Sequence, residues 1–256
     1  MTNHVTVTSA QGVLTLTLVR PEKMNALTNA MYAALADAIT GAEADTSVRA
    51  IIIRGEGAMF TAGNDLAEFA AVAAGTAGES QVRRFLSALA ESTKPVVAAV
   101  SGRAVGVGTT LLLHCDFVVL AEDALLSTPF VNLALVPEAA SSLLLPSRIG
   151  HARAFEMFSL GKPISAAQAL AWGIANRVVP KADLHGEAHQ VAELLAKQAA
   201  GSLKMTKVLM RQGQAVAAQM ELESAQFAER LLSPEAREAF TAFAEKRAPD
   251  FLKFAE

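Results

Sequence analysis

The sequence AVGVGTT at residues 104–110, read together with FTAGNDL at residues 60–66, is the most informative part of this chain. Each stretch reads as a loop that contains glycine, and glycine allows a ligand to approach the backbone closely. We expect Gly106-Val107-Gly108 to open a helix that continues through residues 111–113. The N–H groups at a helix start have no partner within the helix and lie at the positive end of its dipole. The two loops therefore predict a cradle of backbone N–H groups for one oxyanion.

A single carboxylate, Glu138, follows Pro137 within the largely apolar stretch TPFVNLALVPEAASS at residues 128–142. One interpretation is structural, because the helix dipole favours a glutamate in the first turn of a helix. The other is functional, because apolar surroundings raise the pKa of a carboxyl and suit it to proton transfer near neutral pH. An oxyanion cradle beside a lone base is what an enzyme needs to transfer a proton at a carbon next to a carbonyl.

The 256 residues are 52% hydrophobic and 18% charged, which predicts one large domain, or one domain with a helical appendage. The net charge of −3 and the absence of a long basic run argue against nucleic acid as the main partner. Lys204, Lys207 and Arg211 share one helical face, which we interpret as solvated. Cys115 is the only cysteine, so no internal disulfide and no cysteine-built metal site are possible, and we expect it to be a small buried hydrophobe.

The terminal segments predict a cytoplasmic protein. Residues 1–5 lack the basic start and apolar run of a secretion signal, and residues 253–256 are no peroxisomal address. The apolar run at residues 111–113 is interrupted by His114 and Asp116, which leaves it far too short to span a membrane.

Strand patterns alternate with helix patterns in the first half of the chain. Residues 5–7 and 13–18 alternate apolar and polar positions, which predicts a hairpin with one face in water. Thr28 is a candidate cap for a helix that Gly41 would end. Further strands are expected at residues 48–53, 96–100 and 117–120, with a helix around Phe85 before the second of them. Strands that alternate with helices imply an α/β fold with parallel pairing and right-handed crossovers.

From about residue 139 the pattern changes to one helix after another. Ser165 is expected to cap one of these helices, and residues 177–179 read as a strand. Further along, we place helix breaks at residues 201–202, 233–234 and 248–249. The loop at residues 68–78, rich in Ala and Gly, is the segment that we expect to be most mobile.

Several familiar chemistries fail on spacing. Gly102, Gly106 and Gly108 do not form a dinucleotide fingerprint, because the third glycine would fall at the wrong position. His185 and His189 lie one helical turn apart, but no glutamate adjoins the first of them, so we interpret them as an exposed helix face. The chain also has no Gly-x-Ser-x-Gly elbow for a nucleophilic serine.

Five motifs together resemble the crotonase (enoyl-CoA hydratase/isomerase) superfamily over about residues 5–180: RPEKMNAL at 20–27, FTAGNDL at 60–66, KPVVAAVSG at 94–102, the loop at 104–110, and Cys115-Asp116. The resemblance implies an α/β spiral of β-β-α turns that forms two roughly perpendicular sheets. It places this spiral core at residues 1–195 and a C-terminal helical region, which builds a homotrimer or homohexamer, at residues 196–256. It also implies an acyl-CoA substrate, no cofactor besides the coenzyme A that the substrate carries, no metal, and neither nucleic acid nor membrane as partner.

The same resemblance implies that the backbone N–H groups of Asn64 and Val107 hold the thioester carbonyl. Asp65, next to Asn64, reads as a cap or turn former rather than a base. Lys23 is expected to meet the phosphates of coenzyme A, and Lys246 is interpreted as a solvated lysine. The full set of residues expected to contact substrate is Lys23, Ala26, Ala62, Gly63, Asp65, Leu66, Gly106, Thr110 and Phe130.

Departures from the superfamily pattern narrow the expected activity. Thr110 and Phe130 stand where the hydratases of the superfamily carry their two glutamates, so the addition of water lacks its acid and base. We therefore expect Thr110→Ala to have little effect. Residues 128–142 instead resemble the isomerases that convert 3-enoyl-CoA to 2-enoyl-CoA, in which one glutamate after the proline is the base. Glu138 occupies that place and is the expected catalytic residue, which suggests a role in the β-oxidation of fatty acids.

Two other interpretations stay open at this point. The first keeps the fold and Glu138 but changes the substrate to ring-derived CoA thioesters from aromatic degradation, in an isomerase or hydratase. Such substrates need a wider pocket, and the small residues Ala134, Ala139 and Ala140 allow one. The second is a non-catalytic paralogue that binds acyl-CoA or RNA. The acidic balance speaks against RNA, and the intact cradle with its carboxylate speaks against an inactive site.

Overall fold

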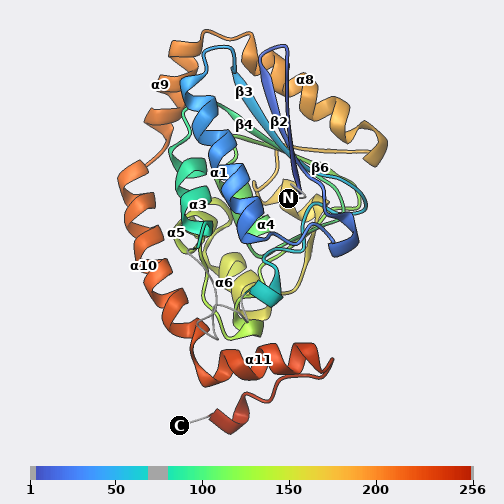
Figure 1. The fold of residues 1–256 in the computed structure, drawn as a ribbon, viewed down its shortest axis with the longest axis vertical. Helices are drawn as coiled ribbons and strands as arrows, with labels where there is room; N and C mark the ends of the chain where they lie inside the picture. Colours follow the sequence, from blue (N-terminus) through green and yellow to red (C-terminus); the bar gives the residue numbers. More distant parts are fainter. Residues whose placement is uncertain (1–3, 69–79, 255–256) are drawn as a thin grey trace.

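The computed structural model describes residues 4–68 and 80–254, which form two β-sheets surrounded by helices (Figure 1). The larger sheet has the strand order β1-β2-β3-β4-β6-β9, and the smaller has the order β5-β7-β8. The strands are β1 (Val5–Ala10), β2 (Val13–Leu18), β3 (Ala50–Gly55), β4 (Val96–Val100), β5 (Arg103–Val105), β6 (Phe117–Ala121), β7 (Leu125–Ser127), β8 (Ile164–Ser165) and β9 (Arg177–Val179). The structure thus confirms the α/β class.

The α-helices lie outside the sheets, and three of them follow one another at the C-terminal end. They are α1 (Asn29–Ala44), α3 (Val82–Glu91), α4 (Val107–Thr110), α5 (Ser141–Ile149), α6 (His151–Leu160), α7 (Ala166–Ala171), α8 (Leu184–Ala196), α9 (Ala200–Met210), α10 (Gly213–Leu231) and α11 (Pro234–Ala244). Two short 3-10 helices matter below, η1 (Pro21–Lys23) and η2 (Leu111–His114). The expected division of the chain at residue 195 stays a prediction.

The larger sheet is buried on both faces, which explains the continuous apolar runs in its central strands. Side chains alternate between the faces of a strand, so Ile51 and Ile53 of β3 join one core cluster while Ile52 joins another. The first cluster includes α1 and α3, and the second includes the apolar face of α8. From β2 to β9 all neighbouring strands pair in parallel, as expected of strands linked by helices.

The N-terminal hairpin is confirmed, but its expected water-facing side holds only for one strand. β1 and β2 pair antiparallel from Val5↔Leu18 to Ala10↔Val13. β1 is the edge strand and is exposed beyond Val5, whereas β2 is almost wholly buried. The difference arises because β2 also pairs with β3 and lies beneath flanking helices.

Two expected helix ends were wrong, and two helix caps are confirmed. α1 begins after Thr28, whose side chain accepts a hydrogen bond from the Met31 N–H, but it continues past Gly41 to Ala44. Gly41 is exposed, and the cost of one glycine in a helix, about 1 kcal/mol, does not stop it. The break expected at residues 201–202 lies just before α9 instead. Ser165 caps α7 as the sequence indicated, and Ser233, at a predicted helix break, caps α11.

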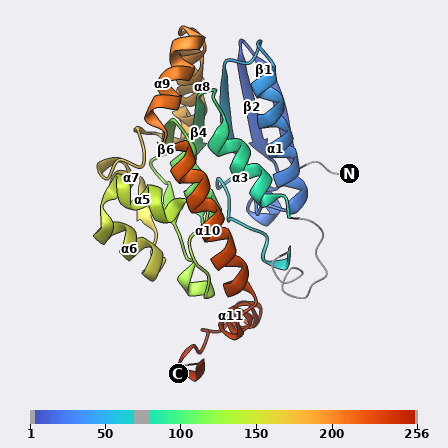
Figure 2. The same cartoon turned by 90° about the vertical axis from the view of Figure 1, so that its left-hand side faces the viewer.

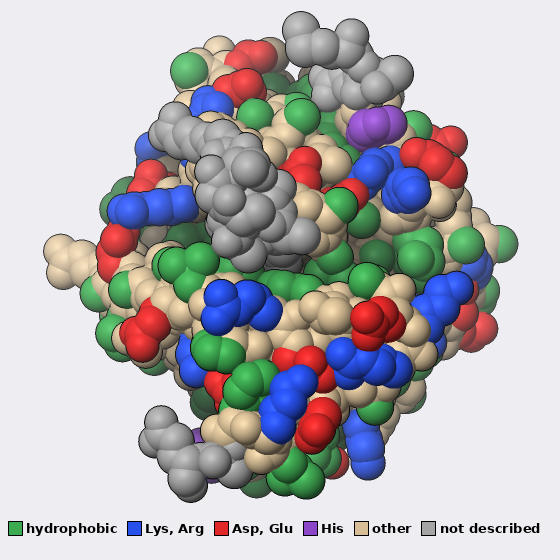
Figure 3. Space-filling view, turned by 60° about the horizontal axis from the view of Figure 1, so that its bottom comes forward, with side chains coloured by type: hydrophobic (Ala, Val, Ile, Leu, Met, Phe, Trp, Pro, Cys, Tyr) green, Lys and Arg blue, Asp and Glu red, His purple; other side chains and the backbone are tan. Residues whose placement is uncertain are grey.

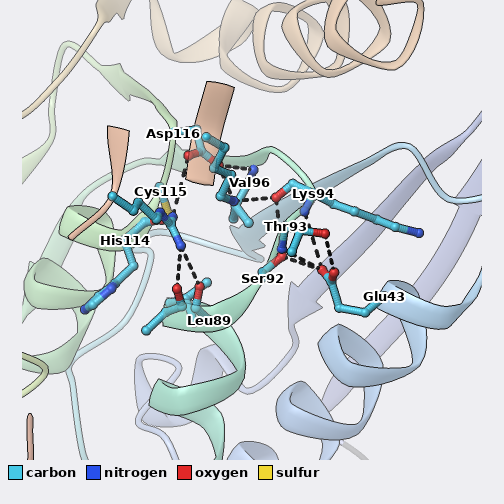
Figure 4. A network of polar contacts seen from close by, with 12 residues as sticks. Glu43, Leu89, Ser92, Thr93, Lys94, Val96, His114, Cys115 and Asp116 are labelled. Carbon is cyan, nitrogen blue, oxygen red and sulfur yellow. Dashed lines mark hydrogen bonds and ion pairs between the residues drawn. The ribbon is translucent and has the colours of Figure 1, made fainter. Parts of the chain in front are cut away.

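The basic face expected to be solvated is partly buried, so that interpretation was wrong for Lys207. Its ammonium group lies 2.6 Å from Asp116 Oδ2 and also donates to the Lys94 carbonyl. Figure 4 shows Asp116 at the top of this network, where it also accepts a hydrogen bond from the Val96 N–H. The Lys207 ammonium is itself buried, so it needs an anionic partner, whereas Lys204 on the same helix is exposed. Cys115, beside Asp116, is buried as expected.

The long helix α10 links the C-terminal helices to the rest of the molecule. It runs from the end of α9 to α11 and passes α3 and α5 on the way (Figure 2). Since α5 begins three residues after Glu138, α10 packs behind the loop that carries the candidate base.

Candidate active site

The two glycine-containing loops lie side by side in parallel. Thr61 pairs with Ala104, and the Val105 N–H donates to the Thr61 carbonyl at 3.1 Å. Three residues further along each segment, this register brings Asn64 and Val107 to equivalent positions. The first segment also lies against residues 20–27, because the Leu27 N–H donates to the Gly63 carbonyl at 2.8 Å.

Glycine is required where the two segments touch. Gly63 has a φ of 88°, and a Cβ there would lie 2.7 Å from the Val105 carbonyl oxygen. A Cβ on Gly108 would lie 2.4 Å from Thr61 Cγ2. Both distances are below any ordinary carbon contact, so a side chain at either position would push the segments apart.

The backbone donors of Asn64 and Val107 are left for a ligand. Val107 is the first residue of α4, and Gly106 precedes it with a φ of 56°. Within the described residues, neither the Asn64 N–H nor the Val107 N–H donates to a protein acceptor. Backbone N–H groups in a protein interior are nearly always paired, so two unpaired donors in facing segments mark a place where an acceptor can bind.

Glu138 is buried beside this pair of segments. Its side chain lies in a loop ahead of α5 rather than in the first turn of the helix, which removes the structural interpretation of this residue. Only 8% of the residue is exposed, and its Oε1 atom accepts a hydrogen bond from Thr110 Oγ1 at 2.5 Å. Its Oε2 atom is buried and has no partner in the described part of the chain.

The surroundings of Glu138 shift its acidity into the neutral range. Burial raises the pKa of its carboxyl to about 7, against the opposing effect of the Thr110 hydrogen bond, and the negative charge of Glu223 raises it further. A carboxyl with this pKa is ionised and protonated in comparable amounts near pH 7. It can therefore both accept and return a proton.

The loop that carries Glu138 is held in a strained conformation. Ala139 and Ala140 have φ values of 62° and 53°, a left-handed backbone that costs a residue other than glycine about 1–2 kcal/mol. His114 Nε2 lies 2.7 Å from the Ala139 carbonyl oxygen, and burial lowers the His114 pKa to about 4. The imidazole is thus neutral near pH 7, and its Nε2–H donates to that carbonyl. Val107, Thr110 and His114 all lie on the continuous segment α4–η2. This one segment therefore supplies the unpaired Val107 N–H, the Thr110 hydrogen bond to Glu138 and the His114 contact with the Glu138 loop.

Tyr32 of α1 supports the other side of the site. Its hydroxyl donates to Asn64 Oδ1 at 2.5 Å, and its ring is buried against Phe85. Burial raises the Tyr32 pKa well above its ordinary value, and the charges of Glu138 and then Glu68 raise it further. Tyr32 thus contacts Asn64 directly and is near enough to Glu138 to be affected by its charge.

The remaining candidate residues are distributed more widely. Lys23 is exposed at the end of η1, and Ala26, Ala62 and Leu66 are half-buried. The Gly106 N–H is already bonded to the Ser127 carbonyl. Phe130 lies in a separate apolar cluster with Leu135 and Leu231, apart from the one that holds Val107 and Ala139. Lys246 is exposed. Of the loop expected to be mobile, residues 69–78 lie outside the described residues.

Asp65 has structural partners for its carboxylate. It forms an ion pair with Arg20 at 2.7 Å and accepts a bond from the Ala67 N–H. Burial acts to raise the Asp65 pKa, but the hydrogen bonds from Arg20 and Ala67 outweigh it and lower the pKa. Such a carboxylate is a weak base, in agreement with the role of turn former.

Three supporting residues escaped the sequence analysis, namely Tyr32, His114 and Glu223. Tyr32 is the only tyrosine of the chain and falls beside the apolar positions of its helix, which was the one available signal. His114 and Glu223 act through backbone groups of the Glu138 loop, and no spacing in the sequence reports such contacts.

The described surface adds three observations. On the face in Figure 3, hydrophobic side chains gather across the middle, with charged side chains of both signs around them. No described helix has the length and apolar character that crossing a membrane requires. Across residues 4–68 and 80–254, no three His, Cys, Asp or Glu side chains are grouped to hold a metal ion.

The two sheets with their flanking helices and helical C-terminal region match the structures of crotonase-fold proteins. A family model described as Enoyl-CoA hydratase/isomerase matches residues 8–253. The chain belongs to this family and is an enzyme of the crotonase superfamily.

Similar proteins span several activities. The chain is 36% identical over 249 residues to the 1,2-epoxyphenylacetyl-CoA isomerase of Escherichia coli K12, covering 94% of this chain and 95% of that protein. It is 34% identical over 215 residues to Enoyl-CoA delta isomerase 2 of Rattus norvegicus, covering 82% of this chain and 55% of that protein. A crystal structure of an enoyl-CoA hydratase/isomerase from Pseudoalteromonas atlantica T6c superposes with a TM-score of 0.92 at 43% identity, covering 97% of this chain and 99% of that one.

Proposed function

We propose that the protein is an isomerase that shifts the double bond of 3-enoyl-CoA thioesters to give 2-enoyl-CoA. The observation that carries the proposal is Glu138, a buried carboxyl with a pKa of about 7 and an oxygen without a partner among residues 4–68 and 80–254. It stands beside the segment of Val107, while the two glutamate positions of the hydratases hold Thr110 and Phe130.

The proposed reaction needs one base and one oxyanion cradle. The N–H groups of Asn64 and Val107 bind the thioester oxygen, and Glu138 takes the proton from the α carbon. The electron pair of the broken C–H bond moves toward the carbonyl and forms an enolate. Each backbone donor of this kind lowers the barrier by roughly 3–4 kcal/mol. The enolate then collapses as Glu138 returns the proton to the γ carbon, which leaves the double bond between the α and β carbons.

The wider contacts belong to the same proposal. Lys23 meets the phosphates of coenzyme A, and Ala26, Ala62, Gly63, Asp65, Leu66, Gly106, Thr110 and Phe130 complete the substrate site. Coenzyme A arrives as part of the substrate, so no separate cofactor is needed. Exposed apolar side chains on α9, with Leu209 81% and Met210 80% exposed, support assembly as a homotrimer or homohexamer.

Ring-derived CoA thioesters are the second candidate substrates. The similarity to the 1,2-epoxyphenylacetyl-CoA isomerase over nearly its whole length favours them. Ala139 and Ala140, next to Glu138, have side chains of a single methyl group, as a site for a bulky ring would require. The mechanism would again use Glu138 as the only base.

A substrate panel tests the proposal. Purified protein is assayed with 3-hexenoyl-CoA for isomerisation, with a 2-enoyl-CoA for hydration, and with ring-bearing thioesters. We expect isomerisation to dominate, and Glu138→Gln to abolish it while acyl-CoA binding, measured by calorimetry, is nearly unchanged. Turnover retained in Glu138→Gln would remove Glu138 from the mechanism. Binding without turnover of any substrate would identify a non-catalytic paralogue.

A further inference from the structure

Glu223 is a second buried carboxylate near the candidate base, and it comes from the C-terminal helix α10. The residue is 5% exposed. Its Oε1 atom accepts hydrogen bonds from the Ser142 N–H at 2.9 Å and from the Ser142 hydroxyl. Gln219, one turn earlier on α10, donates to the same hydroxyl at 2.7 Å. The Oε2 atom of Glu223 is buried and lacks a hydrogen-bond partner in the described part of the chain.

Through Ser142, Glu223 binds the first turn of α5, which directly follows the loop that carries Glu138. Ser142 is the second residue of α5, and the Ser141 N–H donates to the Glu138 carbonyl at 3.1 Å. The left-handed residues Ala139 and Ala140 lie between. Such a loop keeps its shape only where its surroundings fix it. His114 fixes it at the Ala139 carbonyl, and Glu223 fixes it at Ser142.

Three titratable groups lie near Glu138 or its loop, each from a different element. Tyr32 of α1 has a raised pKa, and His114 of η2 has a pKa of about 4, so both are neutral near pH 7. Glu223 of α10 is the carboxyl among the three, and its negative charge, when it is ionised, acts on Glu138. Burial raises the Glu223 pKa, and the bonds from Ser142 oppose this by favouring the charged form.

The geometry points to Glu223 as a positioning residue for the proton transfer: from α10 it holds the loop of Glu138 and keeps a second carboxylate beside that base. The inference rests on the proposed role of Glu138. In this role, the C-terminal helix α10 supports the active site through the loop that carries Glu138. A like charge nearby makes the ionised form of Glu138 less favourable, so Glu138 binds its proton more firmly than burial alone would cause.

Two variants of Glu223 separate its two roles. Glu223→Gln keeps an oxygen that can accept the Ser142 bonds but removes the charge. We expect the acidic limb of the pH–rate profile to move to lower pH by roughly half a unit or more, with KM unchanged. Glu223→Ala also removes the hold on Ser142, and we expect kcat to fall by roughly tenfold or more, with KM retained. Glu221→Gln is the matched control, because Glu221 lies on the same helix but pairs with Arg83 at the surface.

A readout that does not depend on turnover separates this inference from the proposed function. Protein labelled with ¹³C-carboxyl glutamate is titrated by NMR, and the Glu138 signal is assigned by its loss in Glu138→Gln. A lower Glu138 pKa in Glu223→Gln, but not in Glu221→Gln, supports the inference even if no 3-enoyl-CoA is turned over. An unchanged Glu138 titration and pH–rate profile in Glu223→Gln would overturn it. Since Glu223→Gln preserves the hydrogen bonds, the test stands even if Glu223→Ala fails to fold.

Discussion

The hydroxyl of Thr110 donates a hydrogen bond to Glu138 Oε1 at 2.5 Å, one helical turn after Val107. The residue that stands where hydratases of the superfamily carry a glutamate is thus a partner of the candidate base. This contact uses one lone pair of Oε1, whereas Oε2 has no partner among the described residues and is free to take a proton. It also overturns the basis for expecting Thr110→Ala to have little effect.

Thr110→Val should leave less of Glu138 ionised at a given neutral pH. The Thr110 hydrogen bond lowers the Glu138 pKa, so removing the hydroxyl without changing the side-chain shape should raise it. The acidic limb of the pH–rate profile should then move to higher pH, and less of the base is ionised at pH 7. Thr110→Ser keeps a hydroxyl and serves as the control. Identical profiles for the valine variant and the wild type would show that the contact has no role in the proton transfer.

Tyr32→Phe should weaken the oxyanion cradle through Asn64. The lost hydroxyl leaves the Asn64 side chain without its bond at 2.5 Å, at a cost in stability of about 1 kcal/mol. We expect kcat to fall by roughly tenfold, because Asn64 can then shift relative to Val107. Asn64→Ala retains the backbone N–H donor but also loses the hydrogen bond between Tyr32 and residue 64, so its kcat should fall by a similar factor.

A double-mutant cycle decides whether Tyr32 acts through Asn64. If it does, Tyr32→Phe combined with Asn64→Ala should be little worse in kcat than either single change. Fully additive losses would mean that the Tyr32 hydroxyl acts elsewhere.

The periodic parts of the fold could be predicted from the sequence, because each depends on residues close together in the chain. The strand at residues 96–100 matches β4 to the residue, and Thr28 and Ser165 cap their helices. The helix end predicted at Gly41 was wrong because one exposed glycine destabilises a helix only slightly. Lys207 was wrongly predicted to be exposed, because its stabilising partner Asp116 lies 91 residues away in the sequence.

The candidate site was predictable in its motifs but not in its supports. The glycine positions and Glu138 follow from local patterns and from the resemblance to the crotonase superfamily. Contacts such as His114 with Ala139 or Glu223 with Ser142 join segments 25 and 81 residues apart. One partner in each contact is a backbone group, and every residue has those, so the sequence contains no mark of the pairing.

Lys207→Met should destabilise the protein by about 1 kcal/mol, because it leaves the solvent-exposed Asp116 carboxylate without its closest cation. Arg211 remains 3.5 Å from Asp116 Oδ1 and limits the loss. Lys204→Met on the same helix is the control and should stay within about 0.5 kcal/mol of the wild type. Urea unfolding measures both variants. Equal stabilities for the two would mean that the Lys207–Asp116 ion pair contributes nothing net to the fold.

Glu138→Gln should stabilise the protein at alkaline pH while it removes activity. The Glu138 pKa rises from 4.5, the ordinary value for a glutamate, to about 7 in the folded protein, so the folded state binds the proton more tightly than the unfolded chain. Stability should therefore fall as pH rises from 4.5 to 7 and stay lowered above that range. The full difference corresponds to about 3 kcal/mol at most, and glutamine, which cannot ionise, avoids it.

Thermal or urea unfolding of Glu138→Gln and wild type across this pH range measures the effect. The variant should be the more stable protein at about pH 8 and should lose that advantage below pH 4.5. Glu56→Gln, at an exposed glutamate, should follow the wild type throughout. A constant difference between Glu138→Gln and wild type at every pH would contradict a raised Glu138 pKa. The gain in stability would then have to come from packing, and the argument for Glu138 as a base near neutral pH would lose its electrostatic support.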